Sequence, residues 1–316
     1  MKKTCVWASL ALVFSILSND AFATSQARIA LKVVDDEVKA VAMFPVIAGF
    51  DGGDEFKGQT DTNGLFIMEG KAGFGVARYV LNKTGYYFGQ GKYILNGGVK
   101  DDKYQPWNPV VPIVVRRVIN PIPMYAKHVD ARIPAENTDL GFDLKAGDWM
   151  APYGAGQQAD FVFYFSRRIS GDRDYEGNLK LVFLRPCDGI LANHEVYPES
   201  NFKLPRFASE GNYATNWLYR IGEDPKAGYF GLRQAEIDKS YFLRVRSVVD
   251  ENGKLKEALY GKVAGEIRVG GVARSTGADI IFTYYLNPTP NDRNMEFDPK
   301  RNLMKNLKST EQVNMP

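Results

Sequence analysis

Residues 161–183 read FVFYFSRRISGDRDYEGNLKLVF, and this stretch decides the fold class of the chain. Phenylalanine occupies every second position at its start, and Leu179, Leu181 and Phe183 do the same at its end. An apolar side chain at every second position is typical of a β-strand with one buried face. Gly171 and the charged residues around it favour a loop over 170–174. The stretch therefore predicts a β-hairpin.

The same period of two recurs along the chain, whereas helical periodicity is nearly absent. It is clearest over residues 28–34, 56–60, 65–69, 76–82, 241–249, 259–269 and 280–286. We therefore expect an all-β protein with two antiparallel β-sandwich domains, the larger one of jelly-roll type as one arrangement. The hairpins do not fix its strand order. The predicted units are a small sandwich over 24–105, a Pro-rich connection over 106–123 with an edge strand over 113–118, a larger sandwich over 124–287, and an extended or partly disordered tail over 288–316.

Composition excludes several classes of protein. The chain has 316 residues, 45% of them hydrophobic and 24% charged, which is typical of a globular protein and not of a disordered or collagen-like one. Lys and Arg number 40 against 37 Asp and Glu, a net charge of +3. Because nucleic-acid binding calls for a clustered basic surface, we expect no nucleic-acid partner.

The first residues predict export. Lys2 and Lys3 precede an apolar run over 6–17, and Ala21-Phe22-Ala23 follows it. This order is that of a secretory signal peptide with cleavage after Ala23, and the run is shorter than the ~20 residues that span a bilayer. We expect a periplasmic or secreted protein without a membrane span after cleavage. A single cysteine, Cys187, then remains, so no internal disulfide is expected.

Three short elements lie in the predicted small sandwich. They are Val34-Asp35-Asp36, then QTDTNGLF over residues 59–66, then KTGYY over residues 83–87. With these elements residues 28–95 resemble a carboxypeptidase regulatory-like domain, the transthyretin-like (prealbumin-like) β-sandwich. The chain lacks the family's Pro-rich opening after the first strand, so residues 38–44 are expected to form the second strand instead. The resemblance implies a non-catalytic module attached to other secreted domains, and it brings no catalytic residues.

One acidic pattern is a candidate metal-binding site. Asp172, Asp174 and Glu176 alternate before Gly177, as oxygen ligands do in calcium loops. Counted from Asp172, the twelfth position is Phe183, which cannot bind calcium, so an EF-hand is excluded. A looser structural calcium site and a solvated hairpin tip are the two interpretations left. Apart from calcium, no cofactor is expected.

Three aromatic residues are candidates for ligand binding. Trp149, Tyr153 and Trp217 lie in stretches that read as loops, and exported β-sandwiches can bind sugars by stacking them on aromatic rings. Packing in the core is the alternative for each tryptophan. No catalytic residue can be named, because the chain has neither His-Glu-x-x-His nor Gly-x-Ser-x-Gly.

These observations favour an exported, non-catalytic binding or structural module that engages a polysaccharide, an envelope component or an extracellular protein. The alternative is a secreted hydrolase of the glycoside hydrolase type, whose two carboxylates are brought together only in the fold. Self-assembly through the tail is a third hypothesis. The sequence leaves open whether the protein is an enzyme, and it favours the view that it is not.

Overall fold

The structure is a computed structural model that describes residues 24–231 and 239–316. The predicted signal peptide, residues 1–23, lies outside the described residues. The first group of strands is β1 (Ser25–Val34), β2 (Pro45–Phe50), β3 (Glu55–Gln59), β4 (Leu65–Ala72), β5 (Val76–Leu81), β6 (Gly89–Ile94), β7 (Val99–Lys100), β8 (Lys103–Tyr104) and β9 (Val110–Val114). The second group is β10 (Tyr125–Arg132), β11 (Asp139–Asp143), β12 (Asp148–Trp149), β13 (Phe161–Gly171), β14 (Asp174–Val182), β15 (Gly189–His194), β16 (Asn216–Asp224), β17 (Gly228–Phe230), β18 (Lys239–Val249), β19 (Leu255–Gly270) and β20 (Asp279–Leu286).

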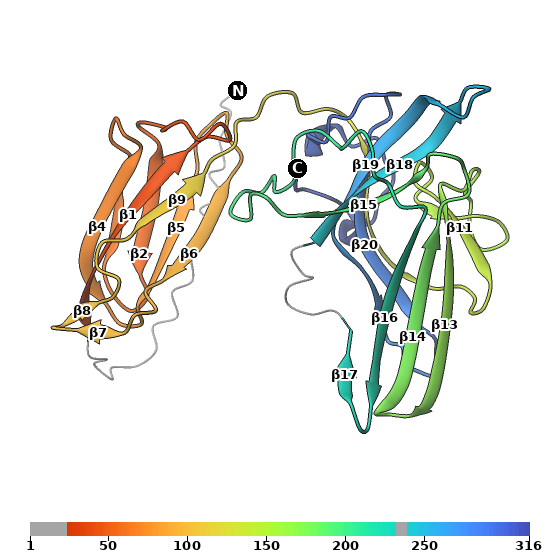
Figure 1. The fold of residues 1–316 in the computed structure, drawn as a ribbon, viewed down its shortest axis with the longest axis horizontal. Coiled ribbons are helices and arrows are strands. Elements are labelled where there is room, and N and C mark those ends of the chain that lie inside the picture. Colours follow the sequence, from red (N-terminus) through yellow and green to blue (C-terminus); the bar gives the residue numbers. More distant parts are fainter. Residues whose placement is uncertain (1–23, 232–238) are drawn as a thin grey trace, which may run out of the picture.

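The two groups form two β-sandwiches that lie side by side (Figure 1), which confirms the all-β fold class. In the N-terminal sandwich, one sheet has the order β4-β1-β8-β7 with β9 also on β1, and the other has the order β3-β2-β5-β6. Ile29, Leu31 and Val33 of β1 are fully buried between them, as their alternation predicts. β9 lies in the Pro-rich segment and runs parallel to β1 at the edge of its sheet.

One local expectation for the N-terminal sandwich is corrected. Residues 38–44 do not form the second strand, because Val38 and Met43 adopt φ angles of 66° and 51° that an extended chain does not allow. The second strand is β2, which begins at Pro45. The turn at residues 61–64 joins two sheets, because β3 pairs with β2 whereas β4 pairs with β1.

The C-terminal sandwich consists of sheets with the orders β10-β20-β19-β18-β15 and β12-β11-β13-β14-β16-β17. The hairpin predicted from residues 161–183 is β13–β14, with Phe163 opposite Leu181 and Phe165 opposite Leu179. Its loop is shorter than predicted, since the strands end at Gly171 and restart at Asp174. Five of the nine neighbouring pairs in these two sheets are consecutive strands, so the order differs from the two Greek keys of a jelly roll.

A third layer covers the outer face of the sheet that contains β19. It consists of residues 195–214 and of the tail after β20, and it buries a second set of apolar residues: Leu204, Ala208, Phe242, Ala258, Tyr260, Met295, Tyr285, Phe297 and Val313. The tail is extended, with two short 3-10 turns, η1 (Pro299–Arg301) and η2 (Ser309–Glu311). The Asn302 side chain donates to the carbonyl of Ala126 at 2.8 Å and accepts from its N–H at 3.2 Å, as a neighbouring strand would.

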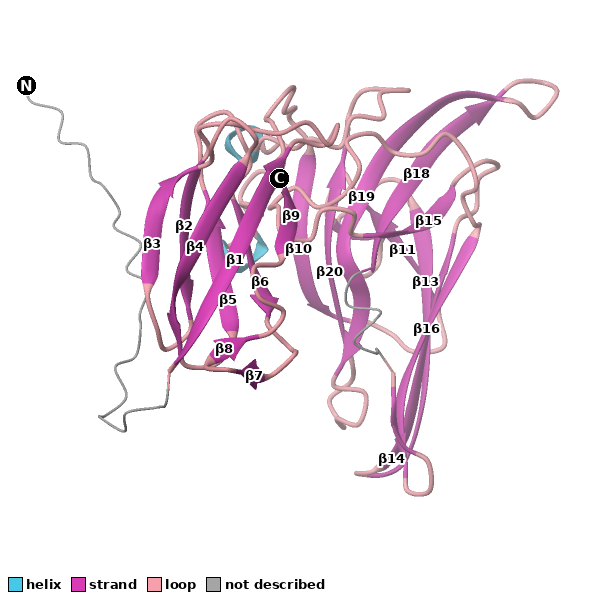
Figure 2. Ribbon diagram, turned by 60° about the vertical axis from the view of Figure 1, so that its left-hand side comes forward, coloured by secondary structure: helices cyan, strands magenta, loops and turns pink. Residues whose placement is uncertain are grey.

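Residues 115–122 connect the two sandwiches and form hydrogen bonds with the N-terminal sandwich and with the tail. Val115 N–H donates to Val34 at 2.8 Å, and the Arg116 carbonyl accepts from Tyr87 N–H at 2.8 Å. Further along, Ile122 N–H donates to the carbonyl of Glu296 in the tail at 2.8 Å. The C end of the chain lies between the two groups of strands in Figure 1 and near β9 in the view of Figure 2. We call this region, where residues 115–122, 195–206 and the tail meet, the junction.

Within residues 24–231 and 239–316, no helix combines the length and the apolar character that a bilayer span requires.

Candidate functional site

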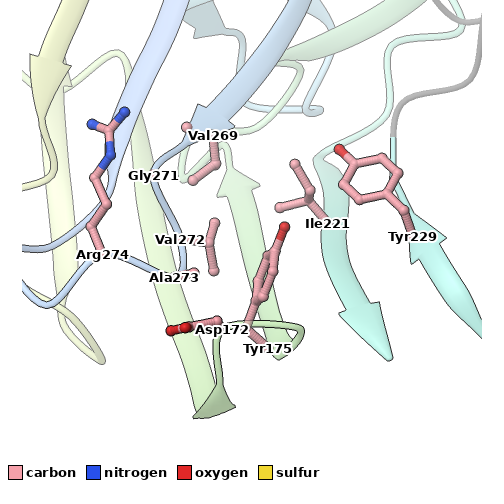
Figure 3. Close-up of a pocket in the computed structure, with 10 residues that line it drawn as sticks. Asp172, Tyr175, Ile221, Tyr229, Val269, Gly271, Val272, Ala273 and Arg274 are labelled. Carbon is pink, nitrogen blue, oxygen red and sulfur yellow. The ribbon is translucent and has the colours of Figure 1, made fainter. Parts of the chain in front are cut away.

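A cleft of about 370 Å³ lies where the two sheets of the C-terminal sandwich come together near the β13–β14 turn. Figure 3 shows that it is lined from several elements, with two tyrosines among the side chains. The lining residues are Asp172, Tyr175, Ile221, Tyr229, Val269, Gly270, Gly271, Val272, Ala273 and Arg274. We call it the tyrosine cleft. Its volume falls in the range of small-ligand pockets.

The strand register positions the two tyrosines. Tyr175 on β14 lies opposite Glu223 on β16, and Glu223 lies opposite Tyr229 on β17. Residues directly opposite one another share a face of the sheet, so both tyrosines belong to one row on the inner face. Ile221 lies two residues before Glu223 and faces the same way. The sheet therefore presents aromatic and aliphatic surface along one wall of the cleft.

The opposite wall is held by Arg167. Its Nη1 donates to the carbonyl of Val272 at 2.8 Å and to that of Arg274 at 2.6 Å. Its Nε lies 2.7 Å from a carboxylate oxygen of Glu136. Gly177 adds a steric reason for this shape, because a Cβ there would lie 3.0 Å from the Val272 side chain. The loop at 271–274 is thus fixed before any ligand arrives.

Within the described part of the chain, the rim of the cleft carries one carboxylate and one guanidinium. Asp172 lies at the hairpin turn, and Arg274 is paired with Asp279 at 3.0 Å. Tyr229 is 59% exposed, and burial of its hydroxyl, with Tyr175 close by, raises its pKa. The tyrosine therefore stays neutral and can donate or accept a hydrogen bond. Apolar walls with tyrosines and polar groups at the edge suit a sugar ring, which has an apolar face and polar edges.

Trp149 does not lie in this cleft, and its surroundings favour core packing over the predicted ligand-binding role. Its side chain is 6% exposed and belongs to the core between the two sheets. Its ring packs edge-on against Phe142 at 5.2 Å and against Phe163 at 5.9 Å between centroids. Core packing, the alternative for this tryptophan, is what the structure shows.

Replacing Trp149 by phenylalanine should lower the free energy of unfolding by about 1–2 kcal/mol, because a smaller ring leaves part of the core unfilled. Binding to any polysaccharide should not change. Urea unfolding and affinity electrophoresis of the same preparation measure the two effects. A variant of native stability that has lost binding would restore the ligand-binding role.

Tyr153 and Trp217 differ from Trp149 in burial and in their contacts. Tyr153 is exposed in the turn after β12. Trp217 on β16 is partly buried against the core, stacks on Tyr219 with ring centroids 5.9 Å apart, and donates through Nε1 to Tyr241 at 3.3 Å. Neither residue lines the tyrosine cleft. The structure therefore does not assemble the three aromatic residues into one platform.

The acidic residues proposed for calcium are bound by arginines. Asp174 pairs with Arg168 at 2.8 Å, and Glu176 pairs with Arg220 at 2.8 Å. The hydrogen bond from Arg220 lowers the pKa of Glu176. A calcium ion would have to displace both arginines, and the third residue, Asp172, lines the cleft instead. Across residues 24–231 and 239–316, no three His, Cys, Asp or Glu side chains are grouped as a metal site requires.

Tyr175, Ile221 and Tyr229 were not singled out from the sequence. The available signal was alternation: Trp217, Tyr219, Ile221 and Glu223 occupy one face of a strand, and tyrosines flank that strand in its neighbours. Pairing of β16 with β14 and β17 makes this row, and the pairing is not readable from the sequence. Of the residues that the structure describes, one carboxylate, Asp172, lines the cleft, whereas glycoside hydrolysis uses a pair.

Comparison with known proteins does not assign the chain to a family. No family model matches the chain, and no curated protein matches it. Among solved structures, a 3-chlorocatechol 1,2-dioxygenase from Rhodococcus opacus is 13% identical with a TM-score of 0.24, over 32% of this chain and 63% of its own length. A DUF3823 family protein from Parabacteroides merdae is 11% identical over 75% of this chain and 96% of its own, with a TM-score of 0.21. BcpA, the major pilin subunit of Bacillus cereus, is 10% identical over 83% of this chain and 85% of its own, with a TM-score of 0.22. No function is transferred from similarities at this level.

Proposed function

We propose that the protein is an exported, non-catalytic binding module that engages a polysaccharide through the tyrosine cleft. The observation that carries the proposal is the cleft itself, with Tyr175 and Tyr229 in one row and a fixed apolar wall opposite. The features of residues 1–23 support export to the periplasm or the outside of the cell. The resemblance of residues 28–95 to a carboxypeptidase regulatory-like domain supports a role as a non-catalytic accessory unit.

Replacing Tyr229 by alanine should weaken polysaccharide binding roughly tenfold, since loss of one stacked ring removes about 1.4 kcal/mol. Stability should hardly change, because the ring is largely exposed. The measurement is retardation in native gels that contain xylan, β-glucan, chitosan or pectin, with released reducing ends assayed in the same samples.

Tyr153→Ala is the matched control, because it removes an exposed tyrosine outside the cleft and should bind as the wild type does. Equal weakening in both variants would argue against the cleft. Release of reducing ends would favour the glycoside hydrolase alternative. Absence of retardation by any polysaccharide would contradict the proposal and favour a protein partner.

A further inference from the structure

Lys262 is a buried lysine with few partners. It lies near the middle of β19 on the face that the third layer covers, and it is 2% exposed. Its Nζ donates one hydrogen bond, to the carbonyl of Met295 at 2.8 Å. The same atom lies 4.8 Å from the centre of the Phe202 ring and 4.4 Å from that of Tyr285. In the part of the chain that the structure describes, no ion pair of Lys262 is found.

The ring of Phe202 is shared by three cationic side chains. The Arg116 guanidinium lies 4.2 Å from its centre, that of Arg206 lies 5.5 Å away, and Lys262 is the third. Arg116 also donates to the carbonyls of Phe202 and Leu204, each at 2.6 Å. Arg116 follows β9, whereas Phe202 and Lys262 belong to the C-terminal half. The cluster is therefore at the junction between the sandwiches.

The described carboxylates near Phe202 do not balance the positive charge of the three cationic side chains around its ring. Asp36 lies 3.7 Å from Arg116 and 3.5 Å from Arg206, and Glu296 is paired with Arg206. Two arginines thus face two carboxylates, and a protonated Lys262 adds an unpaired positive charge. An arginine does not lose its proton in a protein, whereas a lysine can.

The other side of Lys262 borders a cavity of about 470 Å³ between sheet and tail. Its titratable side chains are few. Glu195 and Lys203 neutralise each other at 2.9 Å, and Nδ1 of His128 is hydrogen-bonded to Thr283 at 2.8 Å. Tyr285 completes the surroundings with its ring, and burial raises the pKa of its hydroxyl well out of the neutral range. None of these groups supplies the missing negative charge.

We propose that Lys262 makes the junction a proton-sensitive joint, which is closed most firmly when the amine is neutral and is weakened when the amine takes up a proton. Opening the junction would move Arg116 away and relieve its repulsion of the ammonium. Burial, with Arg116 nearby, lowers the pKa of Lys262 from 10.5 to about 7, although Glu296 opposes the shift.

The sign of the pH dependence follows from linkage. In the window between pH 7 and the higher pKa that Lys262 has once Arg116 has moved away, the open state binds more protons than the closed state. Each rise of one pH unit in this window therefore favours closure by up to about tenfold, and below pH 7 the dependence on Lys262 ends. The joint is thus weakest at neutral and acidic pH.

A dye pair tests the joint directly. Cysteines introduced by Ile67→Cys and Leu218→Cys, both exposed sites and one on each sandwich, carry a donor and an acceptor in a Cys187→Ser background. Energy transfer is followed from pH 6 to 10 in moderate urea. The open fraction of the parent should fall as the pH rises through 7–10, whereas Lys262→Met should stay closed throughout and Lys262→Arg should be open to a constant extent. Lys180→Met, which removes an exposed lysine on β14 far from Lys262 in the sheet order, is the control and should behave as the parent does.

An open fraction that is independent of pH between 7 and 10 in the parent would overturn the proposal. So would loss of energy transfer that coincides with loss of near-UV circular dichroism at every pH, since Lys262 would then act on the whole fold. If Lys262→Met does not fold, the ε-CH₂ resonance of Lys262 in the unmodified protein decides, because titration near pH 7 supports the joint and titration near pH 10.5 contradicts it. Neither readout depends on the tyrosine cleft, so the joint can fail or hold independently of the proposed function.

Discussion

Replacing Glu296 by alanine should lower the free energy of unfolding by about 3–5 kcal/mol, because it removes the nearer of the two carboxylates of the largely buried Arg206 guanidinium and leaves only Asp36, at 3.5 Å, among the described residues. Glu296 is 0% exposed. Besides the ion pair with Arg206, it accepts from Tyr87 Oη at 2.7 Å and from the N–H groups of Ile119 and Asn120 at 2.8 and 2.9 Å. One side chain thus serves donors from both sandwiches and from their connection. Urea unfolding measures the loss.

Glu210→Ala is the matched control. Glu210 also pairs with an arginine, Arg293, at 2.8 Å, but at the surface, so its removal should cost under about 1 kcal/mol. Similar losses in the two variants would show that burial of Glu296 contributes nothing to its effect. The pH dependence gives an independent check. Burial acts to raise the pKa of Glu296, but the hydrogen bonds from Arg206 and the two N–H groups outweigh it and lower the pKa. Its stabilising effect should therefore be complete above the ordinary glutamate pKa and be lost as the pH falls through the lowered one.

Replacing Arg246 by methionine should cost a similar amount, about 3–5 kcal/mol, for the opposite reason: two buried carboxylates lose one shared cation. Arg246 Nε donates to Asp160 at 2.7 Å, and Nη2 donates to Asp143 at 2.8 Å and to Asp160 at 2.9 Å. Both aspartates also cap the backbone between β11 and β13, for example through Leu144 N–H on Asp160 at 2.7 Å. Thermal or urea unfolding at pH 7 measures the loss.

The loss of stability caused by Arg246→Met should be smaller at acidic pH. Burial already raises the pKa of Asp160 despite Arg246, and it should rise further without the guanidinium, so protonation removes the unpaired charge as the pH falls. Adding Asp160→Asn to the variant should restore part of the stability for the same reason. As a control, Arg220→Met breaks an exposed pair with Glu176 and should cost under about 1 kcal/mol. A loss of that size for Arg246→Met would contradict the argument.

The parts of the fold that depend on local sequence could be predicted. The hairpin β13–β14 follows from alternation on both sides of a Gly-containing loop, and its register has the predicted phenylalanines opposite leucines. β18, β19 and β20 follow from the same period, with a turn over 250–253 between the first two. In each case the residues that determine the strand are next to one another in the chain.

The parts of the fold that depend on contacts between distant segments could not be predicted from the sequence. Tyr260 and Lys262 occupy the polar positions of an alternating strand, and only the third layer, from residues 195–214 and the tail, buries them. Strict alternation over residues 241–249 would place Arg246 on the face opposite Val245 and the core, but a bulge in β18 and a φ of 57° turn it toward Asp143 and Asp160. The tyrosine cleft likewise arises from the pairing of β14, β16 and β17 and from a loop after β19.

The bound connection between the sandwiches has a mechanical consequence. Residues 115–122 form hydrogen bonds with Val34 and Tyr87 of the N-terminal sandwich and with Glu296 of the tail. The segment therefore cannot extend without breaking these hydrogen bonds. A force that pulls on one sandwich would reach the other through hydrogen bonds loaded together, without first straightening a flexible linker. With the junction closed, the protein would bear tension as one stiff element, and a surface on either sandwich would keep a fixed orientation relative to the other.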